Sequence, residues 1–177
     1  MLKHVLGICS LALLGIPAIA VAHEDEAAQN AVCILVPKSD SEVKGFLRLT
    51  QRDGYVEVKG KVRGLKPGEH GFHVHMYGDL STKDGMAAGG HFNPGGHKHG
   101  GPNSPDHHAG DLGNIKAGED GVAEVDTKAE GVSLSSLLGR SIVVHGDADD
   151  LTSQPSGNAG PRVAVGVIGL SAPPMPK

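Results

Sequence analysis

The sequence predicts an all-β domain in which about eight short antiparallel strands form a sandwich or a barrel. Three observations support this fold class. The apolar runs are short, rich in valine, isoleucine and threonine, and bounded by glycine or proline, which contribute 27 and 11 of the 177 residues. Residues 55–62 alternate with period two, so that one face meets the core and the other meets water. Only residues 133–138 have a helical pattern, and they are enough for a single turn.

Eight runs satisfy these criteria for strands, and two long segments interrupt them. The segments 78–109 and 146–161 are rich in glycine and proline and show no strand periodicity. Long loops without secondary structure are uncommon in compact domains and are often functional. We therefore expect these two loops to carry or flank the functional site. The expected strands are 31–36, 43–50, 55–63, 71–77, 110–117, 123–127, 141–146 and 162–169.

The N-terminus is typical of a secretory signal peptide. A short charged start containing Lys3 precedes a nearly unbroken apolar run over 5–20, and Ala20-Val21-Ala22 is a small-x-small cleavage signal. A retained membrane anchor is the alternative, but the run is short for a span of about 20 residues. We therefore expect a signal peptide at 1–22, a flexible segment at 23–30, one domain at 31–177, and a location in the periplasm or outside the cell.

Charge and cysteine content limit the partners of the exported chain. The full sequence has 16 basic and 20 acidic residues, and losing Lys3 leaves 15 against 20, a net charge of −5. This gives no electrostatic reason to expect nucleic acid as a partner, and no later segment is apolar enough to cross a membrane. Without Cys9, only Cys33 remains, so no intramolecular disulfide is possible. We expect Cys33 to be a buried thiol, with an intermolecular disulfide as the alternative.

Three histidines lie on predicted strands and suit a copper ion. His73 and His75 are two residues apart on one strand, so their side chains project from the same face. His145 lies on another strand. Imidazole nitrogens are good ligands for copper and zinc, and three of them on a rigid sheet suit tetragonal copper(II). This set predicts a copper site.

Four further ligands come from the glycine-rich loop and its exit, and they suit zinc. They are His91, His99, His108 and Asp111. Three nitrogens and one carboxylate oxygen can complete a closed tetrahedral zinc site. Organising so long a loop costs conformational entropy, which zinc binding can offset. The two sets together predict two adjacent metal ions.

The remaining histidines have simpler interpretations. We expect the ring nitrogens of His70 to form hydrogen bonds with backbone groups. His97 and His107 lie beside the loop ligands but do not fit their spacing, so we expect both to be solvated. His23 becomes the N-terminal residue if the signal peptide is cleaved after Ala22, and its amine and ring are then a possible copper chelate.

The motifs that contain these ligands resemble the copper/zinc superoxide dismutases. The resemblance runs from about residue 31 to 170, and the spacings of eight, nine and three residues between the loop ligands also fit the family. The resemblance implies an eight-stranded Greek-key β-barrel, and the family is a known example of the β-sandwich architecture. The matching motifs are G-F-H-V-H-x-x-G-D, G-G-H-F-N-P, K-H-G-G-P, H-A-G-D-L-G-N, V-V-H-x-x-A-D-D-L and G-N-A-G-P-R.

The resemblance assigns a role to each ligand. It implies that His91 is shared by both metals as an imidazolate, which two cations make possible. Asp149 in A-D-D-L matches the family carboxylate that hydrogen-bonds ligands of both metals and orients their rings. The implied copper ligands are His73, His75, His91 and His145, and the implied zinc ligands are His91, His99, His108 and Asp111.

The resemblance also implies the reaction, the dismutation of two superoxide anions to oxygen and hydrogen peroxide. Copper changes oxidation state, zinc does not, and the ring of His91 leaves copper on reduction and carries a proton. Arg162 in G-N-A-G-P-R matches the arginine that guides the anionic substrate, a role for which superoxide dismutase is itself a standard example of electrostatic steering. The catalytic residues implied are therefore Arg162 and His91.

The chain departs from the family at its disulfide. The two positions fall at about Gly85 or Met86 and at Val165, and neither is cysteine. The missing link would close a loop of about 80 residues, worth on the order of 4 kcal/mol. We therefore expect a weaker metal-free form and a less certain position for Arg162. Residues 152–161 contain no charged side chain, so steering depends mostly on Arg162 and the metals.

Two questions stay open on the sequence alone. The segment Gly166–Gly169 resembles one that pairs subunits in eukaryotic relatives, so both a homodimer and a monomer are consistent with it. A periplasmic carrier or buffer of copper and zinc is the alternative to an enzyme, because the disulfide is absent and extra histidines are present. A carrier, however, needs neither a bridging ligand nor an arginine beside the copper.

Overall fold

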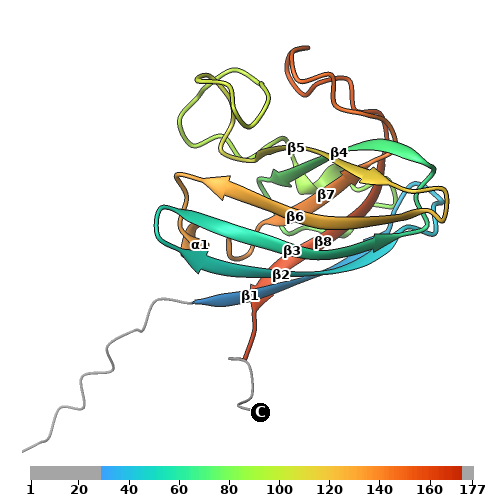
Figure 1. Ribbon diagram of the computed structural model, residues 1–177, viewed down its shortest axis with the longest axis horizontal. Coiled ribbons are helices and arrows are strands. Elements are labelled where there is room, and N and C mark those ends of the chain that lie inside the picture. The colour runs from blue at the N-terminus through green and yellow to red at the C-terminus, as the bar shows by residue number, and fades with distance from the viewer. Residues whose placement is uncertain (1–28, 173–177) are drawn as a thin grey trace, which may run out of the picture.

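A computed structural model of the chain describes residues 29–172 and shows a closed, all-antiparallel β-barrel (Figure 1). The strand order around the barrel is β1-β2-β3-β6-β5-β4-β7-β8. Strand β3 pairs with β6 instead of β4, which is the Greek-key crossover, and it confirms the predicted fold class. The strands are β1 (Asn30–Pro37), β2 (Lys44–Arg52), β3 (Tyr55–Arg63), β4 (Gly68–His75), β5 (Asp111–Ala117), β6 (Val122–Glu130), β7 (Ser141–His145) and β8 (Arg162–Leu170).

The predicted helical turn and one unpredicted turn complete the secondary structure. Helix α1 (Leu134–Leu137) is capped by Ser133, whose side chain accepts from the Ser136 N–H, and it buries both of its leucines. The 3-10 helix η1 (Met86–Ala88) lies in the long loop between β4 and β5. In residues 29–172, no helix has the length and hydropathy needed to cross a membrane.

Alternate residues of the strands fill the barrel with aliphatic side chains. In β3, Val56, Val58 and Val62 are fully buried, while Lys59 and Arg63 on the opposite face are exposed. This follows the period-two pattern of the sequence, because successive side chains of a strand point to opposite faces. Strands β4 and β7 are buried along nearly all of their length, since the loops cover their outer faces.

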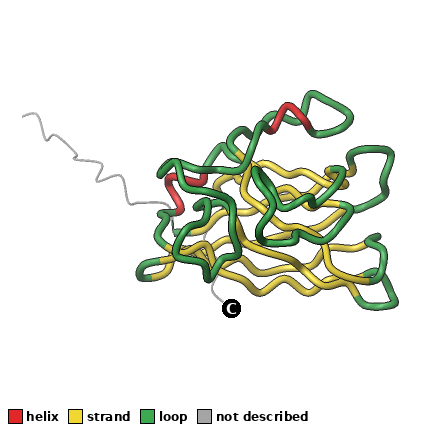
Figure 2. Tube along the Cα trace, turned by 90° about the horizontal axis from the view of Figure 1, so that it is seen from above, coloured by secondary structure: helices red, strands yellow, loops and turns green. Residues whose placement is uncertain are grey.

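The two long loops lie on one side of the barrel, over β4, β5 and β7. Figure 1 shows both at the edge of the barrel farthest from β1, and in Figure 2 they cross in front of the strands. Val74 at the end of β4 exchanges hydrogen bonds with Gly110 and Phe92, which ties the first loop to the sheet at its middle and its exit. The loops therefore have fixed attachments beside β4.

Some predictions from the sequence concern residues that the structure does not describe. The expected signal peptide at 1–22 and most of the segment 23–30 lie outside the described residues, as does His23. Within the described part, β1 begins at Asn30, and the carbonyl oxygen of Gln29 accepts a hydrogen bond from the Gln51 N–H. The sheet therefore begins slightly before residue 31.

Candidate metal centre

Strands β4 and β7 hold three histidines close together. His73 pairs with Val143 of β7, and a bulge between Gly71 and His73 changes the register of β4 against β5. His145 ends β7, next to a second irregularity against β8. A bridge between His75 and His91 then brings the loop histidine against the end of β4. The ligand atoms of these four buried histidines lie within 4.8 Å of one another.

The loop ligands form a second cluster around one carboxylate oxygen. Oδ1 of Asp111 lies 2.7 Å from Nδ1 of His91, 3.1 Å from Nδ1 of His99 and 3.2 Å from Nδ1 of His108. Zinc–nitrogen bonds of about 2.0–2.1 Å in a tetrahedron place neighbouring ligand atoms about 3.3 Å apart. The four atoms therefore have close to the separation that a tetrahedral ion imposes. His91 belongs to both clusters.

Five buried ring nitrogens have no hydrogen-bond partner within the described chain, and all five belong to these clusters. A buried polar atom without a partner costs about 1–3 kcal/mol, so native proteins rarely keep several together. A bound metal ion satisfies an imidazole lone pair, and the residues therefore fit copper and zinc. The atoms are Nδ1 of His73 and His99 and Nε2 of His75, His91 and His145.

The other ring nitrogen of each strand histidine donates to a fixed acceptor. Nδ1 of His75 lies 2.9 Å from the Gly89 carbonyl oxygen, and Nδ1 of His145 lies 3.2 Å from that of Gly160. Because a neutral imidazole has one N–H and one lone pair, each of these bonds leaves the lone pair on Nε2. The backbone thus selects the tautomer in which the free nitrogen faces the cluster.

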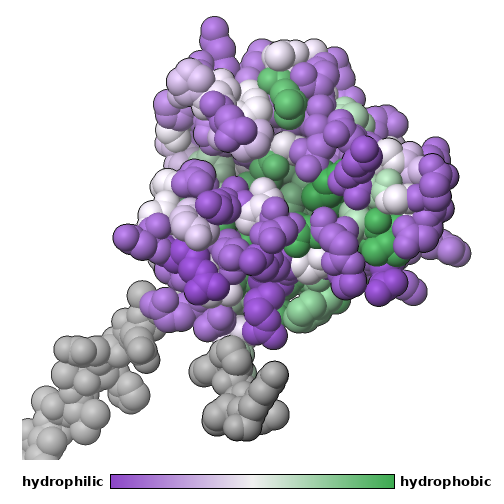
Figure 3. Space-filling view, viewed as in Figure 1, coloured by the Kyte–Doolittle hydropathy of each residue, from purple (hydrophilic) through white to green (hydrophobic). Residues whose placement is uncertain are grey.

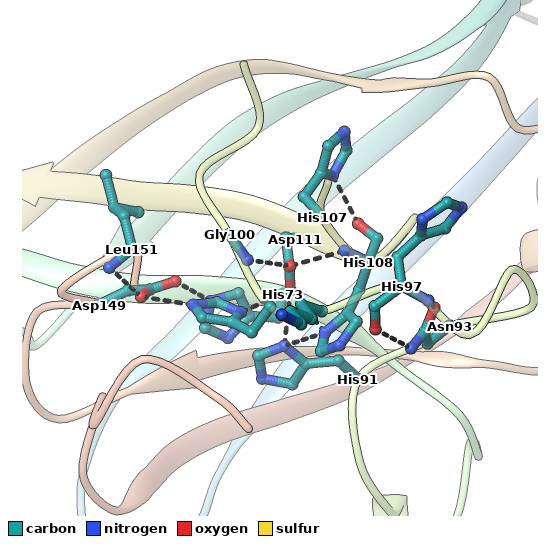
Figure 4. A network of polar contacts seen from close by, with 12 residues as sticks. His73, His91, Asn93, His97, Gly100, His107, His108, Asp111, Asp149 and Leu151 are labelled. Atoms are coloured by element: carbon teal, nitrogen blue, oxygen red, sulfur yellow. Dashed lines mark hydrogen bonds and ion pairs between the residues drawn. The ribbon is translucent and has the colours of Figure 1, made fainter. Parts of the chain in front are cut away.

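Asp149 joins the two clusters through one carboxylate (Figure 4). Its Oδ2 lies 2.7 Å from Nε2 of His73 and its Oδ1 lies 2.9 Å from Nε2 of His99. The Leu151 N–H donates to Oδ1, and Asn114 bonds both backbone groups of Asp149. The structure therefore places Asp149 where it can orient one ring of each metal set. Sequence reasoning missed Asn114, although it ends the motif H-A-G-D-L-G-N.

Burial keeps the strand histidines neutral. It lowers the pKa of His73 to about 4 and that of His145 to about 3, and it lowers the pKa of His75 well below its ordinary value. Burial raises the pKa of Asp111, but hydrogen bonds from His91 and from the Gly100 and His108 N–H groups hold it below its ordinary value. At neutral pH the three strand histidines therefore offer uncharged nitrogens, and Asp111 offers a carboxylate.

Arg162 lies at the edge of a pocket that opens beside the strand cluster. The pocket has a volume of about 610 Å³, and His75, His91 and His145 line it together with Arg162. The guanidinium donates to the carbonyl oxygens of Gly85 and Gly89, each at 2.7 Å. These two hydrogen bonds therefore hold Arg162 in place without the family disulfide.

The remaining candidates lie away from both clusters. His70 is buried, and its ring nitrogens face the carbonyl oxygens of His145 and Lys66 at 2.8 and 2.9 Å. His97 is exposed and pairs with Asp106 at 3.2 Å. His107 is half-buried, and its Nδ1 lies 2.8 Å from the His108 carbonyl oxygen.

Cys33 is buried in the core, with none of its surface exposed, and burial raises the pKa of its thiol to about 12. It is a free cysteine, as expected, and its burial rules out the alternative of an intermolecular disulfide in the folded chain.

The chain matches known proteins over most of its length. Residues 43–168 match the family described as copper/zinc superoxide dismutase (SODC). The chain is 46% identical over 153 residues to superoxide dismutase [Cu-Zn] 3 of Arabidopsis thaliana, an alignment that covers 81% of this chain and 93% of the relative. It is 47% identical over 149 residues to superoxide dismutase [Cu-Zn] 2 of Mesembryanthemum crystallinum, covering 78% and 95%.

These matches confirm the resemblance that the motifs indicate, and they extend it from the metal ligands to the strands of the barrel. The chain therefore belongs to the copper/zinc superoxide dismutase family.

Proposed function

We propose that His91 joins the copper and the zinc of this superoxide dismutase through its two ring nitrogens. One observation carries the proposal: His91 is the only residue of the described chain that belongs to both ligand clusters. Its Nδ1 lies 2.7 Å from the carboxylate of Asp111, on the zinc side. Its Nε2 is buried without a partner, on the copper side.

The other ligands divide between the two ions by cluster. Nδ1 of His73 and Nε2 of His75, His91 and His145 would hold copper. Nδ1 of His91, His99 and His108 and a carboxylate oxygen of Asp111 would hold zinc. This division accounts for all five unpaired nitrogens. It also agrees with metal chemistry, because the set that includes a carboxylate suits zinc and the all-imidazole set suits copper.

Copper supplies one-electron exchange with two superoxide anions in turn, which yields oxygen and hydrogen peroxide. The chain has three tasks around this chemistry. Arg162 attracts the anion into the pocket and hydrogen-bonds it there, because its charge is fixed beside the copper ligands. His91 holds a proton at Nε2 when that nitrogen is not a ligand, and it lines the same pocket. Asp149 keeps the rings of His73 and His99 in place.

Magnetic coupling between two metals tests the shared ring. Protein is loaded with copper(II) and with cobalt(II) in the zinc site, and its electron paramagnetic resonance spectrum is recorded. We expect coupling to suppress the copper signal in the wild-type protein and a separate copper signal in the variant His91→Ala. The matched control is His97→Ala, which changes an exposed histidine of the same loop. Independent signals in the wild-type protein would contradict a bridge.

We further propose export to the periplasm with cleavage after Ala22. The charged start, the apolar run at 5–20 and Ala20-Val21-Ala22 support this proposal. Fractionation of expressing bacterial cells, followed by mass spectrometry, tests it. A mature chain beginning at His23 in the periplasmic fraction is the expected result, and an uncleaved chain in the membrane fraction would instead indicate an anchor.

A homodimer through β1, β8 and the end of β4 is the assembly we propose. Ile34, Tyr77 and Leu170 are large apolar side chains with 53, 55 and 69% of their surface exposed. Tyr77 precedes Gly78, on which a Cβ would lie 3.0 Å from Cγ1 of Val167, and Leu170 ends β8 opposite Ala31 of β1, the strand that carries Ile34. Large exposed apolar patches mark interaction sites.

Sedimentation of the metal-loaded protein tests this assembly. We expect a dimer for the wild-type protein and a monomer for Leu170→Glu. The variant Leu151→Glu is the matched control, because Leu151 is an exposed apolar residue in the loop between β7 and β8, outside the proposed face. A wild-type monomer, or equal loss of the dimer in both variants, would count against this face.

A further inference from the structure

We propose that Met76 and Met86 form a copper(I) capture site at the mouth of the copper pocket, from which the ion passes to the histidines. The proposal rests on the assignment of His73, His75, His91 and His145 as copper ligands. It adds a second, weaker site with different ligands and a different task, which is loading instead of catalysis.

The two methionines line the same pocket as the copper ligands. The pocket is lined by both methionines together with His75, His91, His145 and Arg162. Met76 and Met86 have 37 and 59% of their surface exposed, whereas His75 is 1% exposed. The thioethers therefore lie on the solvent side and the imidazoles on the inner side of one opening.

Gly89 lies near both methionines, close to Met76 through space and to Met86 along the backbone. A Cβ on Gly89 would lie 3.5 Å from Cβ of Met76. The Gly89 N–H donates to the carbonyl oxygen of Met86 at 3.1 Å, which closes η1. Met76 thus follows β4 directly and Met86 begins η1, while the ring of Tyr77 lies closest to Gly89, with atoms 2.9 and 3.1 Å from a Cβ built there. Long, unbranched thioether side chains are flexible enough to converge on one ion in the pocket that both methionines line.

The composition of the pocket selects the kind of ion. Among the described residues that line it, none is aspartate or glutamate, and Arg162 adds a positive charge. A hard divalent cation therefore finds no carboxylate there and is repelled. Thioether sulfur is a soft, uncharged ligand that prefers copper(I) to zinc or copper(II). The pocket mouth accordingly favours the monovalent ion.

A separate observation indicates where the ion goes next. Nε2 of His75 and Nε2 of His145 are buried, have no hydrogen-bond partner in the described chain, and belong to residues that line the pocket. These imidazole nitrogens are stronger ligands than thioethers, so transfer of the ion from the methionines to the histidines is favourable. The step exchanges two sulfur ligands for nitrogen ligands, and the ion remains copper(I) throughout, so no electron donor is needed.

Uptake of copper(I) measures the capture step directly. The full mature chain, loaded with zinc and free of copper, is mixed without oxygen with copper(I) held by a coloured chelator, and loss of colour follows the transfer. We expect the double variant Met76→Leu/Met86→Leu to take up copper(I) on the order of tenfold more slowly than the wild-type protein. Its final copper content is unchanged, because leucine conserves the volume and the histidines remain.

Two controls separate ligand chemistry from shape. The variant Met175→Leu makes the same change outside the described residues, and we expect wild-type kinetics for it. Copper(II) supplied to the double variant should bind at the wild-type rate, since thioethers are poor ligands for that ion. Equal rates for copper(I) in the double variant and the wild-type protein would overturn the proposal. A matching loss for both oxidation states would also overturn it, because it would indicate a structural effect.

A binding measurement on the fully loaded enzyme gives a second readout. Silver(I) serves as a redox-inactive substitute for copper(I), and the methionine methyl carbons are labelled for NMR. We expect silver to shift the methyl signals of Met76 and Met86 but not that of Met175. Unshifted signals for the pair would refute the site. If the wild-type protein binds no copper at its histidines, the ligand assignment fails, whereas silver binding still tests the methionine pair.

Discussion

Gly85 and Val165 face each other so closely that a Cβ on Gly85 would lie 2.9 Å from Cγ2 of Val165. These are the positions at which the family resemblance places a disulfide, and neither is cysteine in this chain. The loop is attached by other contacts instead. Arg162 hydrogen-bonds the carbonyl oxygens of Gly85 and Gly89, and Ala88 packs with Val143 and Val165 in a small buried cluster.

Cysteine at both positions should restore the link and stabilise the metal-free protein. Closing a loop of about 80 residues is worth on the order of 4 kcal/mol. Gly85 has φ of 73°, so a side chain there costs about 1–2 kcal/mol. We expect the oxidised variant Gly85→Cys/Val165→Cys to gain about 2–3 kcal/mol in free energy of unfolding, measured with urea and lost on adding a reductant. The single variant Val165→Cys is the control, and an oxidised form no more stable than the reduced one would contradict the prediction.

Arg162 should carry most of the salt dependence of the enzyme. Residues 152–161 contain no charged side chain, so this part of the loop adds no other charge that guides the anion. We expect Arg162→Ala to lower the rate of superoxide removal by roughly tenfold and to flatten its dependence on ionic strength. Arg162→Lys keeps the charge but not the two-pronged hydrogen bonding to Gly85 and Gly89, so it should retain the salt dependence with an intermediate rate. Pulse radiolysis at several salt concentrations measures both, and an unchanged slope in Arg162→Ala would show that the steering charge lies elsewhere.

The strands could be predicted from the sequence wherever local pattern decides them. The sequence predicts a strand at 55–63, and it is found as β3, because Val56, Val58 and Val62 alternate with polar residues. The start of β4 at Gly68 was missed, since Gly68 and Glu69 are strand residues only through pairing with Ala117 and Lys116 of β5. Likewise, β6 extends to Glu130 because it pairs along the whole of β3. Such ends depend on a neighbour that is distant in the sequence.

The ligand types could also be predicted, but not the groups that orient them. The motifs indicate which side chains are ligands, and the structure brings all seven into two overlapping clusters. The acceptors that select each tautomer are the backbone oxygens of Gly89 and Gly160, which leave no signal in the sequence. The 3-10 helix that carries Met86 could not be predicted either, because the packing of the loop determines its conformation.

Asp149 should control metal affinity without being a ligand. Its two oxygens accept from His73 and His99 at 2.7 and 2.9 Å, and its side chain is fully buried. In Asp149→Asn the amide nitrogen cannot accept, so one of the two rings loses its partner. We expect zinc and copper affinity to fall by about 10–100-fold, measured by competition with a chelator. The control Asp147→Asn changes an exposed carboxylate of the same loop and should keep wild-type affinity. Equal affinities for the wild-type protein and Asp149→Asn would show that the rings are held by other contacts.

The metal-free protein should lose stability on acidification between about pH 6.5 and pH 3. The folded-state pKa values of His73 and His145 lie near 4 and 3, whereas an unfolded histidine titrates near 6.5. In this window the unfolded chain therefore binds protons that the folded chain excludes, and the free energy of unfolding falls as pH falls. Asp111 acts in the same direction at lower pH, because its pKa is depressed in the folded state and its stabilisation is lost on protonation.

Urea unfolding of the metal-free protein at a series of pH values measures this slope. We expect His145→Gln to flatten it, because glutamine does not titrate, whereas His97→Gln should leave it unchanged, since His97 is exposed. In the metal-loaded protein, protons compete with zinc for its histidine ligands, so zinc should dissociate as the pH falls well below 6.5. Retention of both metals at about pH 3 would count against the proposed histidine ligand set.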